Sequence, residues 1–254
     1  MTWLSSWLPA GLGSGEWMMV IAVAVLIGMA KTGVHGAGML SVPFLADVFG
    51  GQASSGVMLP MLLLADVLGV WYYHRHASWE HLRILFPWAA VGVVAGTVFG
   101  KMIDDQLFRL TIAVIIFISL VIMVLLEWTA GKVPQTKPFQ VTTGVLGGFT
   151  SMVGNLANSV TAVYFLSVRL PKEVFIGTTA WFFLVVNAFK LPFHLLVWET
   201  IDTRSFALSL SMLPAIVVGA ALGIWVVGRF SDKQYRWFIV LTTAVAAGSM
   251  LISR

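Results

Sequence analysis

The sequence contains no cysteine, and charged residues make up only 10% of its 254 positions. Without cysteine the chain has no disulfide, no thiol nucleophile and no thiolate ligand for a metal. It also lacks the H-E-x-x-H and G-x-S-x-G motifs, and Ala30 precedes Lys31 where a phosphate-binding loop requires glycine. We therefore expect no enzyme activity, no cofactor and no bound metal.

Charge is scarce because most of the chain is apolar. Hydrophobic residues make up 59% of the sequence and the mean hydropathy is +0.92. Several charge-poor stretches reach the roughly 20 residues that span a bilayer. The formal net charge of +4 is spread over short connectors and forms no basic patch for nucleic acid. The composition predicts an all-α polytopic membrane protein embedded in a lipid bilayer, without nucleic acid as a partner and with an undetermined oligomeric state.

One segment of the chain, residues 78 to 109, recurs 127 positions later, which indicates duplication of a helical unit. The matched positions are Ser78, Pro87, Gly92, Gly96, Asp105 and Arg109, which correspond to Ser205, Pro214, Gly219, Gly223, Asp232 and Arg236. Glycines four residues apart form a small-residue stripe on a helix, so we expect other helices to pack closely there.

Each copy begins with an apolar segment that is interrupted by glycine and polar residues, typical of a re-entrant or broken helical hairpin. Three ordinary spans follow each hairpin. The predicted first repeat covers residues 1–130, with a hairpin at 17–49 and spans at 53–73, 83–100 and 107–126. A linker at 127–138 leads to the second repeat at 139–254, with a hairpin at 141–168 and spans at 174–198, 205–228 and 234–252.

The distribution of basic residues favours an inverted second repeat. If the hairpins are re-entrant, each repeat crosses the membrane three times and the second copy is inverted. One face then receives nine basic residues and the other four, whereas fully spanning hairpins give a split of six to seven. Because basic residues concentrate on the cytoplasmic side, we predict inverted repeats with both termini periplasmic. The basic residues of the richer face are Arg75, Arg83, Lys132, Lys137, Arg169, Lys172, Arg229, Lys233 and Arg236, and those of the other face are Lys101, Arg109, Arg204 and Arg254.

Three ionisable residues, Lys31, Asp66 and Lys190, fall inside apolar spans, where a charge costs about 2.5 to 3.5 kcal/mol on insertion scales. Lys31 lies at the bend of the first hairpin. It is followed by Thr32, Gly33, His35 and Gly36, and the bare backbone N–H groups of such a bend bind anions well. The alternative is that Lys31 extends to a lipid headgroup.

Asp66 corresponds to Asn187 at the offset of 121 that relates the earlier parts of the two copies. Lys190 and His194 follow Asn187 on the same face of a helix. We predict that these four residues provide ion coupling or charge compensation, with a proton or sodium as the coupling ion. Asp66 is alternatively a structural ion-pair partner of Lys31, and Lys190 a headgroup ligand.

The second hairpin contains Gly154, Asn155 and Asn158, which supply uncharged hydrogen-bonding groups opposite the cationic first hairpin. These asparagines also suit plain bonding between helices. The predicted anion site comprises Lys31, Thr32, Gly33, His35, Gly36, Gly154, Asn155 and Asn158. A secondary transporter with alternating access fits this arrangement, and a passive channel is the alternative.

The segments GMAKTGVHGAGMLSVPFLAD and LLLADVLGVWYYHRH, together with the P-x4-G-x3-G helix and the duplicated layout, resemble the TauE/SafE family, also called the TSUP permeases. The resemblance extends over nearly the whole chain and includes a Gly-x4-Pro element from Gly38 to Pro43. It implies a permease of the bacterial inner membrane for small sulfur-containing anions such as sulfite, sulfonates, sulfoacetate or thiosulfate. Family members work as importers or exporters.

Overall fold

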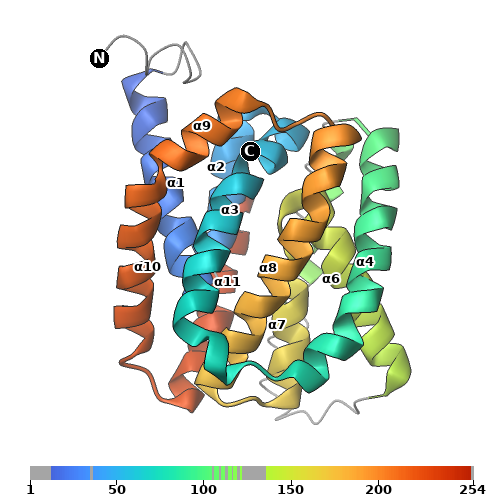
Figure 1. The fold of residues 1–254 in the computed structure, drawn as a ribbon, viewed down its shortest axis with the longest axis vertical. Coiled ribbons are helices and arrows are strands. Elements are labelled where there is room, and N and C mark those ends of the chain that lie inside the picture. The colour runs from blue at the N-terminus through green and yellow to red at the C-terminus, as the bar shows by residue number, and fades with distance from the viewer. Residues whose placement is uncertain are drawn as a thin grey trace.

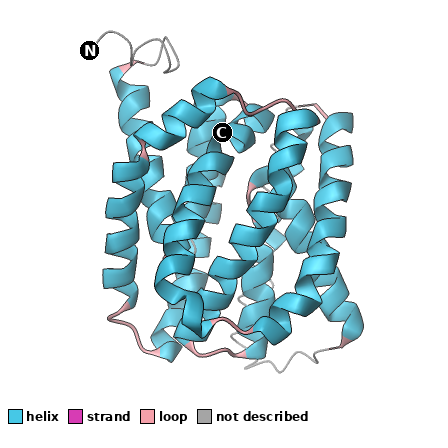
Figure 2. Ribbon diagram, in the orientation of Figure 1, coloured by secondary structure: helices cyan, strands magenta, loops and turns pink. Residues whose placement is uncertain are grey.

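Long apolar segments with few interruptions fold into helices, because a helix satisfies all of its own backbone hydrogen bonds in lipid. The computed structural model describes residues 13–34, 37–104, 106–108, 110–111, 114–115, 117–118, 121 and 136–252. Every element in this part of the chain is helical, and Figure 2 shows the helices joined by short loops without any strand between them. The prediction of an all-α protein is confirmed.

The helices of the first half begin near the N-terminus and end before the linker. They are α1 (Ser14–Lys31), α2 (Ala37–Phe49), α3 (Gly51–Tyr73), the short 3-10 helix η1 (His74–His76) and α4 (Trp79–Met102). The second half contains α6 (Lys137–Gly154), α7 (Ala157–Val168), α8 (Lys172–Leu196), α9 (Thr203–Ser211), α10 (Leu213–Val227) and α11 (Asp232–Ile252). Most of the predicted span 107–126, and the predicted linker up to residue 135, lie outside the described residues.

Four of these helices are long and apolar enough to cross a membrane, and α9 with α10 makes a fifth if the bent pair counts as one span. Their outer faces expose large apolar side chains such as Val94 and Val98 on α4, and Val218 and Leu222 on α10. Helices that are apolar on both their inner and their outer faces indicate lipid as the surrounding solvent. The chain is a multi-pass membrane protein.

The two interrupted segments break where the sequence has glycine or asparagine. Helix α1 ends at Lys31, and the next turn uses Gly33 at φ 126°, a conformation that costs glycine little. Helix α6 ends at Gly154, and Asn155 follows in the left-handed conformation at φ 56°. The returning helices α2 and α7 have 13 and 12 residues. At 1.5 Å per residue they are about 20 and 18 Å long, shorter than the roughly 30 Å hydrocarbon core.

The predicted span 205–228 is divided into α9 and α10, which meet at Met212 with a bend of 50°. Serine side chains and a proline lie on the two sides of the division. Ser209 donates its hydroxyl to the Ser205 carbonyl and Ser211 donates to Leu208, and such bonds bend helices because they compete with the backbone ladder. Pro214, in the first turn of α10, has no N–H to extend the ladder across the break. The corresponding segment of the first half is the continuous helix α4, although it contains Pro87.

The small-residue stripes bring helices from opposite halves together. Helix α4 packs on α6, and its copy α10 packs on α1. A Cβ on Gly92 would collide with the Val145 carbonyl of α6, and one on Gly219 would collide with the Val25 carbonyl of α1. The facing helices have glycines of their own, since a Cβ on Gly148 would meet the Ala89 carbonyl and one on Gly28 would meet that of Ile216. Helix α4 of the first half thus packs on the hairpin of the second half, and α10 of the second half packs on the hairpin of the first.

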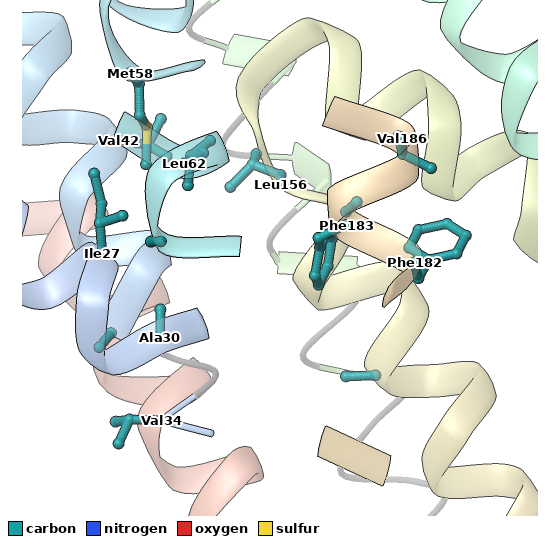
Figure 3. Packing of buried hydrophobic residues seen from close by; sticks show 14 of the residues in the cluster. Ile27, Ala30, Val34, Val42, Met58, Leu62, Leu156, Phe182, Phe183 and Val186 are labelled. Carbon is teal, nitrogen blue, oxygen red and sulfur yellow. The ribbon is translucent and has the colours of Figure 1, made fainter. Parts of the chain in front are cut away.

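Helices α4 and α10 run in opposite directions in Figure 1: α4 ends at the upper end of the bundle, where α10 begins. Helices α3 and α8 lie against each other in the centre and are also antiparallel, because Gly56 near the start of α3 approaches Thr200 just after α8. Figure 3 shows part of the apolar core between them, with Met58 and Leu62 of α3 on one side and Phe183 and Val186 of α8 on the other.

Candidate functional site: a buried ionisable cluster

Four ionisable side chains are buried between helices α1, α3 and α8. Lys31 is 6% exposed, while Asp66, Lys190 and His194 are 0% exposed. We call these four residues, together with Asn187, the buried cluster. Each charge at such a depth costs several kcal/mol unless it is paired or hydrogen-bonded, on the order of 2.5 to 3.5 kcal/mol even on insertion scales. The contacts of each member therefore decide what the cluster can do.

Lys31 and Asp66 form an ion pair between α1 and α3. Lys31 Nζ lies 2.9 Å from Asp66 Oδ1 and 3.9 Å from the centre of the Phe183 ring. The aromatic face and the carboxylate together replace water around the ammonium group. The other carboxylate oxygen, Asp66 Oδ2, accepts a 2.6 Å hydrogen bond from the Asn187 side-chain amide. Of the alternatives that the sequence allows, the structure has Asp66 as the internal partner of Lys31.

Lys190 is surrounded by oxygen atoms that carry no formal charge. Its Nζ donates to Asn155 Oδ1 at 2.6 Å, to the Ser151 carbonyl at 2.8 Å, and to Ser151 Oγ and Asn187 Oδ1, both at 3.1 Å. The only ion pairs among the described residues join Lys31 to Asp66 and His76 to Glu173, so no described carboxylate lies within 4.0 Å of Lys190. A fully buried ammonium group with neutral partners alone is uncommon, because its charge stays uncompensated.

Asn155 holds the tip of the second hairpin against two other helices. Its Nδ2 donates to the Ser55 carbonyl and hydroxyl oxygens of α3, both at 3.2 Å, while its Oδ1 faces Lys190 of α8. The left-handed backbone at Asn155 turns the side chain toward these partners. Asn158 in the next turn is buried, and its Oδ1 has no hydrogen-bond partner among the described residues. The polar tip of this hairpin therefore lies directly on the buried cluster.

The offset of 121 between the halves has a structural counterpart in the cluster. Asp66 and Asn187, which correspond to each other, are in direct contact. Gly69 and Lys190 correspond as well. A Cβ on Gly69 would lie 2.5 Å from the Lys31 carbonyl, while the Lys190 ammonium donates to the Ser151 carbonyl. In the first half, α3 thus packs closely against its hairpin at Gly69. In the second half, α8 contacts its hairpin through a hydrogen bond from Lys190.

Two predicted residues of the first hairpin contact protein groups. The Thr32 hydroxyl lies 3.0 Å from the carbonyl oxygens of both Gly28 and Ala220, and so ties α1 to α10. The Gly33 carbonyl accepts a 2.7 Å hydrogen bond from the Tyr235 hydroxyl. Gly154 is the buried last residue of α6. His35 and Gly36, also predicted for the site, lie outside the described residues.

His194 lies one turn beyond Lys190 on α8, nearer the end of that helix. Its Nδ1 is 2.8 Å from Thr200 Oγ1, and its ring meets the Trp198 ring edge to face at 5.0 Å. The other ring nitrogen, Nε2, is buried without a hydrogen-bond partner in the described part of the chain. The Trp198 indole in turn donates to the Thr97 carbonyl of α4 at 3.0 Å. His194 therefore connects the cluster to the ordered segment that follows α8.

Sequence reasoning missed several contributors to this site, namely Ser55, Ser151, Phe183 and Thr200. Ser151 had a recognisable context, since it lies in the glycine-rich, polar segment GGFTSMVGNLANS. Ser55 and Phe183 stand among ordinary apolar or small residues of α3 and α8, and Thr200 lies in the connector that follows α8. Only the tertiary packing of these segments brings them to the cluster.

Comparison with known proteins identifies the family of the chain. A family model described as "Sulfite exporter TauE/SafE" matches residues 20–250, which include every member of the buried cluster, the second hairpin and all of the first hairpin except its first few residues. The chain belongs to the TauE/SafE family. No curated protein matched the chain, and no solved structure matched it. As a TauE/SafE protein with helices long and apolar enough to cross a membrane, it belongs among membrane transport proteins.

Proposed function

We propose that this protein is a secondary permease for small sulfur-containing anions and that the anion binds at Lys190 in the buried cluster. The observation that carries the proposal is the uncompensated ammonium group. Lys190 is 0% exposed and donates only to uncharged oxygens in the part of the chain that the structure describes. A buried cation without a counter-charge favours the entry of an anion, since the anion supplies the missing partner.

The second hairpin supplies the remaining groups of the proposed site. Asn155 lies beside Lys190, and the buried Asn158 follows in the next turn of the same hairpin. In the bend after Lys31, the backbone N–H groups of Thr32, Gly33 and Val34 donate to the Met29 and Ala30 carbonyls, so we do not include them in the site. The description of the family as sulfite exporters supports a sulfur oxyanion or an organic sulfonate as the substrate. Asp66, Asn187 and His194 are placed to adjust charge during transport, with a proton or sodium ion as the proposed coupling ion.

Alternating access fits the arrangement of the two halves. We propose that they form inverted repeats, each a re-entrant hairpin plus three spans. The exchange of α4 and α10 between the hairpins and the opposite directions of these helices support this (Figure 1). The cluster has almost no solvent exposure, so an anion can enter only when one half rocks against the other. A channel would instead need a continuous aqueous path past Lys190.

Orientation follows from the charges at the two ends. In the described residues, the basic side chains of the connectors gather at the end that contains η1, while the opposite end has few. The first group comprises Arg75, Arg83, Lys137, Arg169, Lys172, Arg229, Lys233 and Arg236, and the second comprises Lys101 and Arg204. We propose that the η1 end is cytoplasmic and that both termini face the periplasm of a bacterial inner membrane.

Uptake by proteoliposomes tests the proposed function. Purified protein is reconstituted, and uptake of sulfite, isethionate and thiosulfate is followed with and without an imposed ion gradient. We expect saturable uptake of at least one of these anions, with a loss of more than about tenfold in Lys190→Met, because the variant lacks the ammonium charge. Lys101→Met is the matched control, since Lys101 is exposed at the end of α4, and it should stay within about twofold of the parent.

The outcomes separate the alternatives. Uptake by Lys190→Met equal to that of the control would overturn the assignment of Lys190, provided that the variant elutes as a folded monodisperse protein. Uptake that never saturates and ignores ion gradients would identify a channel. Absence of uptake for all three anions, in protein that is folded and reconstituted, would contradict the sulfur-anion permease.

A further inference from the structure

The charges of the buried cluster add up to a single positive charge. Lys31 and Asp66 cancel as a 2.9 Å ion pair, whereas Lys190 has no carboxylate partner in the described residues. Among the side chains whose burial the structure describes, which leave out Asp47 of α2, the only buried Lys, Arg, Asp or Glu residues are Lys31, Asp66 and Lys190. With His194 neutral, the buried cluster has one unit of positive charge to offer a ligand.

The side chain of Asn187 lies between the Lys190 ammonium group and the Asp66 carboxylate. A carboxylate only accepts hydrogen bonds and an ammonium group only donates them. The Asn187 amide therefore turns Nδ2 to Asp66 Oδ2 at 2.6 Å and Oδ1 to Lys190 Nζ at 3.1 Å. An aspartate at position 187 would add a second carboxylate to the cluster, next to Lys190, and remove the surplus charge. The amide preserves the surplus by occupying the place of that carboxylate.

We infer that the site binds monovalent anions in preference to divalent anions, because the uncompensated charge of Lys190 is the only one that the buried cluster can match. This inference rests on the proposed function and narrows its substrate class. A monovalent anion makes the closed core neutral. A divalent anion would leave a net negative charge inside, in surroundings of low dielectric constant where unmatched charge is costly.

Such a site would distinguish among sulfur compounds of similar size by their charge. Organic sulfonates and hydrogensulfite carry one negative charge and fit the site. Sulfate, the sulfite dianion and thiosulfate carry two and are disfavoured. Asn155, Ser151 and Asn187 add no charge that would alter this count, since each presents an amide, a hydroxyl or a carbonyl. The charge of the anion therefore affects its binding more than its shape does.

Methanesulfonate and sulfate test the inference directly, since both are tetrahedral sulfur compounds and differ mainly by a methyl group in place of a charged oxygen. Their dissociation constants are measured on the purified protein by calorimetry at pH 8, where an ordinary histidine, with a pKa of about 6.5, is neutral. We expect methanesulfonate to bind at least about tenfold more tightly than sulfate.

Three variants change the buried charge in steps. Asn187→Asp lowers it to zero and should weaken methanesulfonate binding by more than about tenfold. Asp66→Asn raises it to two and should shift the preference toward sulfate. The double variant Lys31→Gln/Asp66→Asn removes the ion pair as a unit and keeps a charge of one, so it should still prefer methanesulfonate whatever its absolute affinity.

Two results would overturn the inference: sulfate binding the parent protein as tightly as methanesulfonate, or a ratio of the two affinities that is the same in the parent and every folded variant. If Asp66→Asn fails to fold, Asn187→Asp still decides, because unchanged methanesulfonate binding would contradict the charge count. Binding of sulfate alone would sink the monovalent preference and leave an anion permease standing. Binding of neither anion, together with no uptake in proteoliposomes, would instead contradict the proposed function itself.

Discussion

Lys31 Nζ lies 2.9 Å from Asp66 Oδ1, and this contact joins α1 to α3 where neither side chain touches solvent appreciably. An ion pair in such a place has an asymmetric energetic role. Forming it from two solvated charges yields little net stability, because desolvation offsets the attraction. Losing one partner is costly, because the other remains as an uncompensated buried charge. The pair is therefore best understood as a unit of two residues.

The first prediction concerns that unit. Lys31→Met should destabilise the protein by about 3 to 5 kcal/mol, because it strands Asp66 in the core. The double variant Lys31→Met/Asp66→Leu should recover most of this loss. Chemical unfolding in detergent, followed by tryptophan fluorescence, measures both, with Lys101→Met as the exposed control. Additive effects of the two single substitutions would show that the two residues act independently.

A second prediction uses two glycines of the same helix. Gly28 of α1 meets the backbone of α10, where a Cβ would collide with the Ile216 carbonyl, whereas Gly15 has no atom within 4 Å of its Cβ position. Gly28→Ala should lower the free energy of unfolding by about 1 to 3 kcal/mol through overpacking. Gly15→Ala should be neutral or stabilising by up to about 1 kcal/mol, because alanine favours a helix. Equal effects at both sites would contradict the close packing of α1 on α10.

The absence of cysteine makes the proposed orientation directly testable. Single cysteines are placed at Arg75, in η1, and at Arg204, at the start of α9, both of which are exposed. A membrane-impermeant maleimide added to intact cells or spheroplasts should label Arg204→Cys and leave Arg75→Cys unlabelled until the membrane is opened. Labelling of Arg75→Cys alone in intact cells would reverse the orientation, and labelling of both would contradict the arrangement of the ends.

The fourth prediction concerns the start of α9. Asp202 caps this helix by accepting a 2.7 Å hydrogen bond from the Ser205 backbone N–H, which lowers the pKa of the Asp202 carboxyl group. Asp202→Ala should cost about 0.5 to 2 kcal/mol, while Asp202→Asn should retain most of the cap. Thermal unfolding of the three proteins in the same detergent at neutral pH gives the comparison. A loss as large in Asp202→Asn as in Asp202→Ala would show that the side-chain acceptor contributes little.

The lowered pKa also fixes the direction of a pH effect. Because the folded pKa lies below the unfolded value of about 3.9, the contribution of the Asp202 carboxylate is fully present above that value. It declines as the pH falls through the lower, folded pKa. The difference in stability between the parent and Asp202→Asn should therefore be constant from neutral pH down to about pH 5 and change only in more acidic solution. A difference that already changes near pH 7 would point to another titrating group.

The helical content and the position of the helix interruptions could be predicted from the sequence. Apolar runs of membrane length indicate helices, and glycine or asparagine at a bend indicates where they stop, since both are local properties of the chain. The bend inside 205–228 was harder to foresee. The sequence has proline at equivalent places in both copies, Pro87 and Pro214, yet only the second copy breaks, at Met212 after the serines of α9.

For the site, the sequence identified the residues but did not decide their contacts. Lys31, Asp66 and Lys190 were recognisable because an ionisable residue is costly inside an apolar span. The sequence allowed an ion pair of Asp66 with Lys31 but did not decide between this pair and a coupling role for Asp66. That choice depends on the glycines that let α3 approach α1, where Gly69 meets the Lys31 carbonyl and Lys31 meets Asp66. It also depends on Asn187, whose amide stands between Asp66 and Lys190.

The sequence alone determined that this chain is a helical membrane protein with ionisable residues in its spans, because composition and local pattern are enough to choose helix and lipid. The tertiary structure decided which charges cancel and which one remains. Ion pairing depends on distances of about 3 Å between residues far apart in the chain, and only the packing of helices from both halves sets those distances. In that packing Asp66 compensates the charge of Lys31. The charge of Lys190 stays uncompensated, and we propose that it binds the anion.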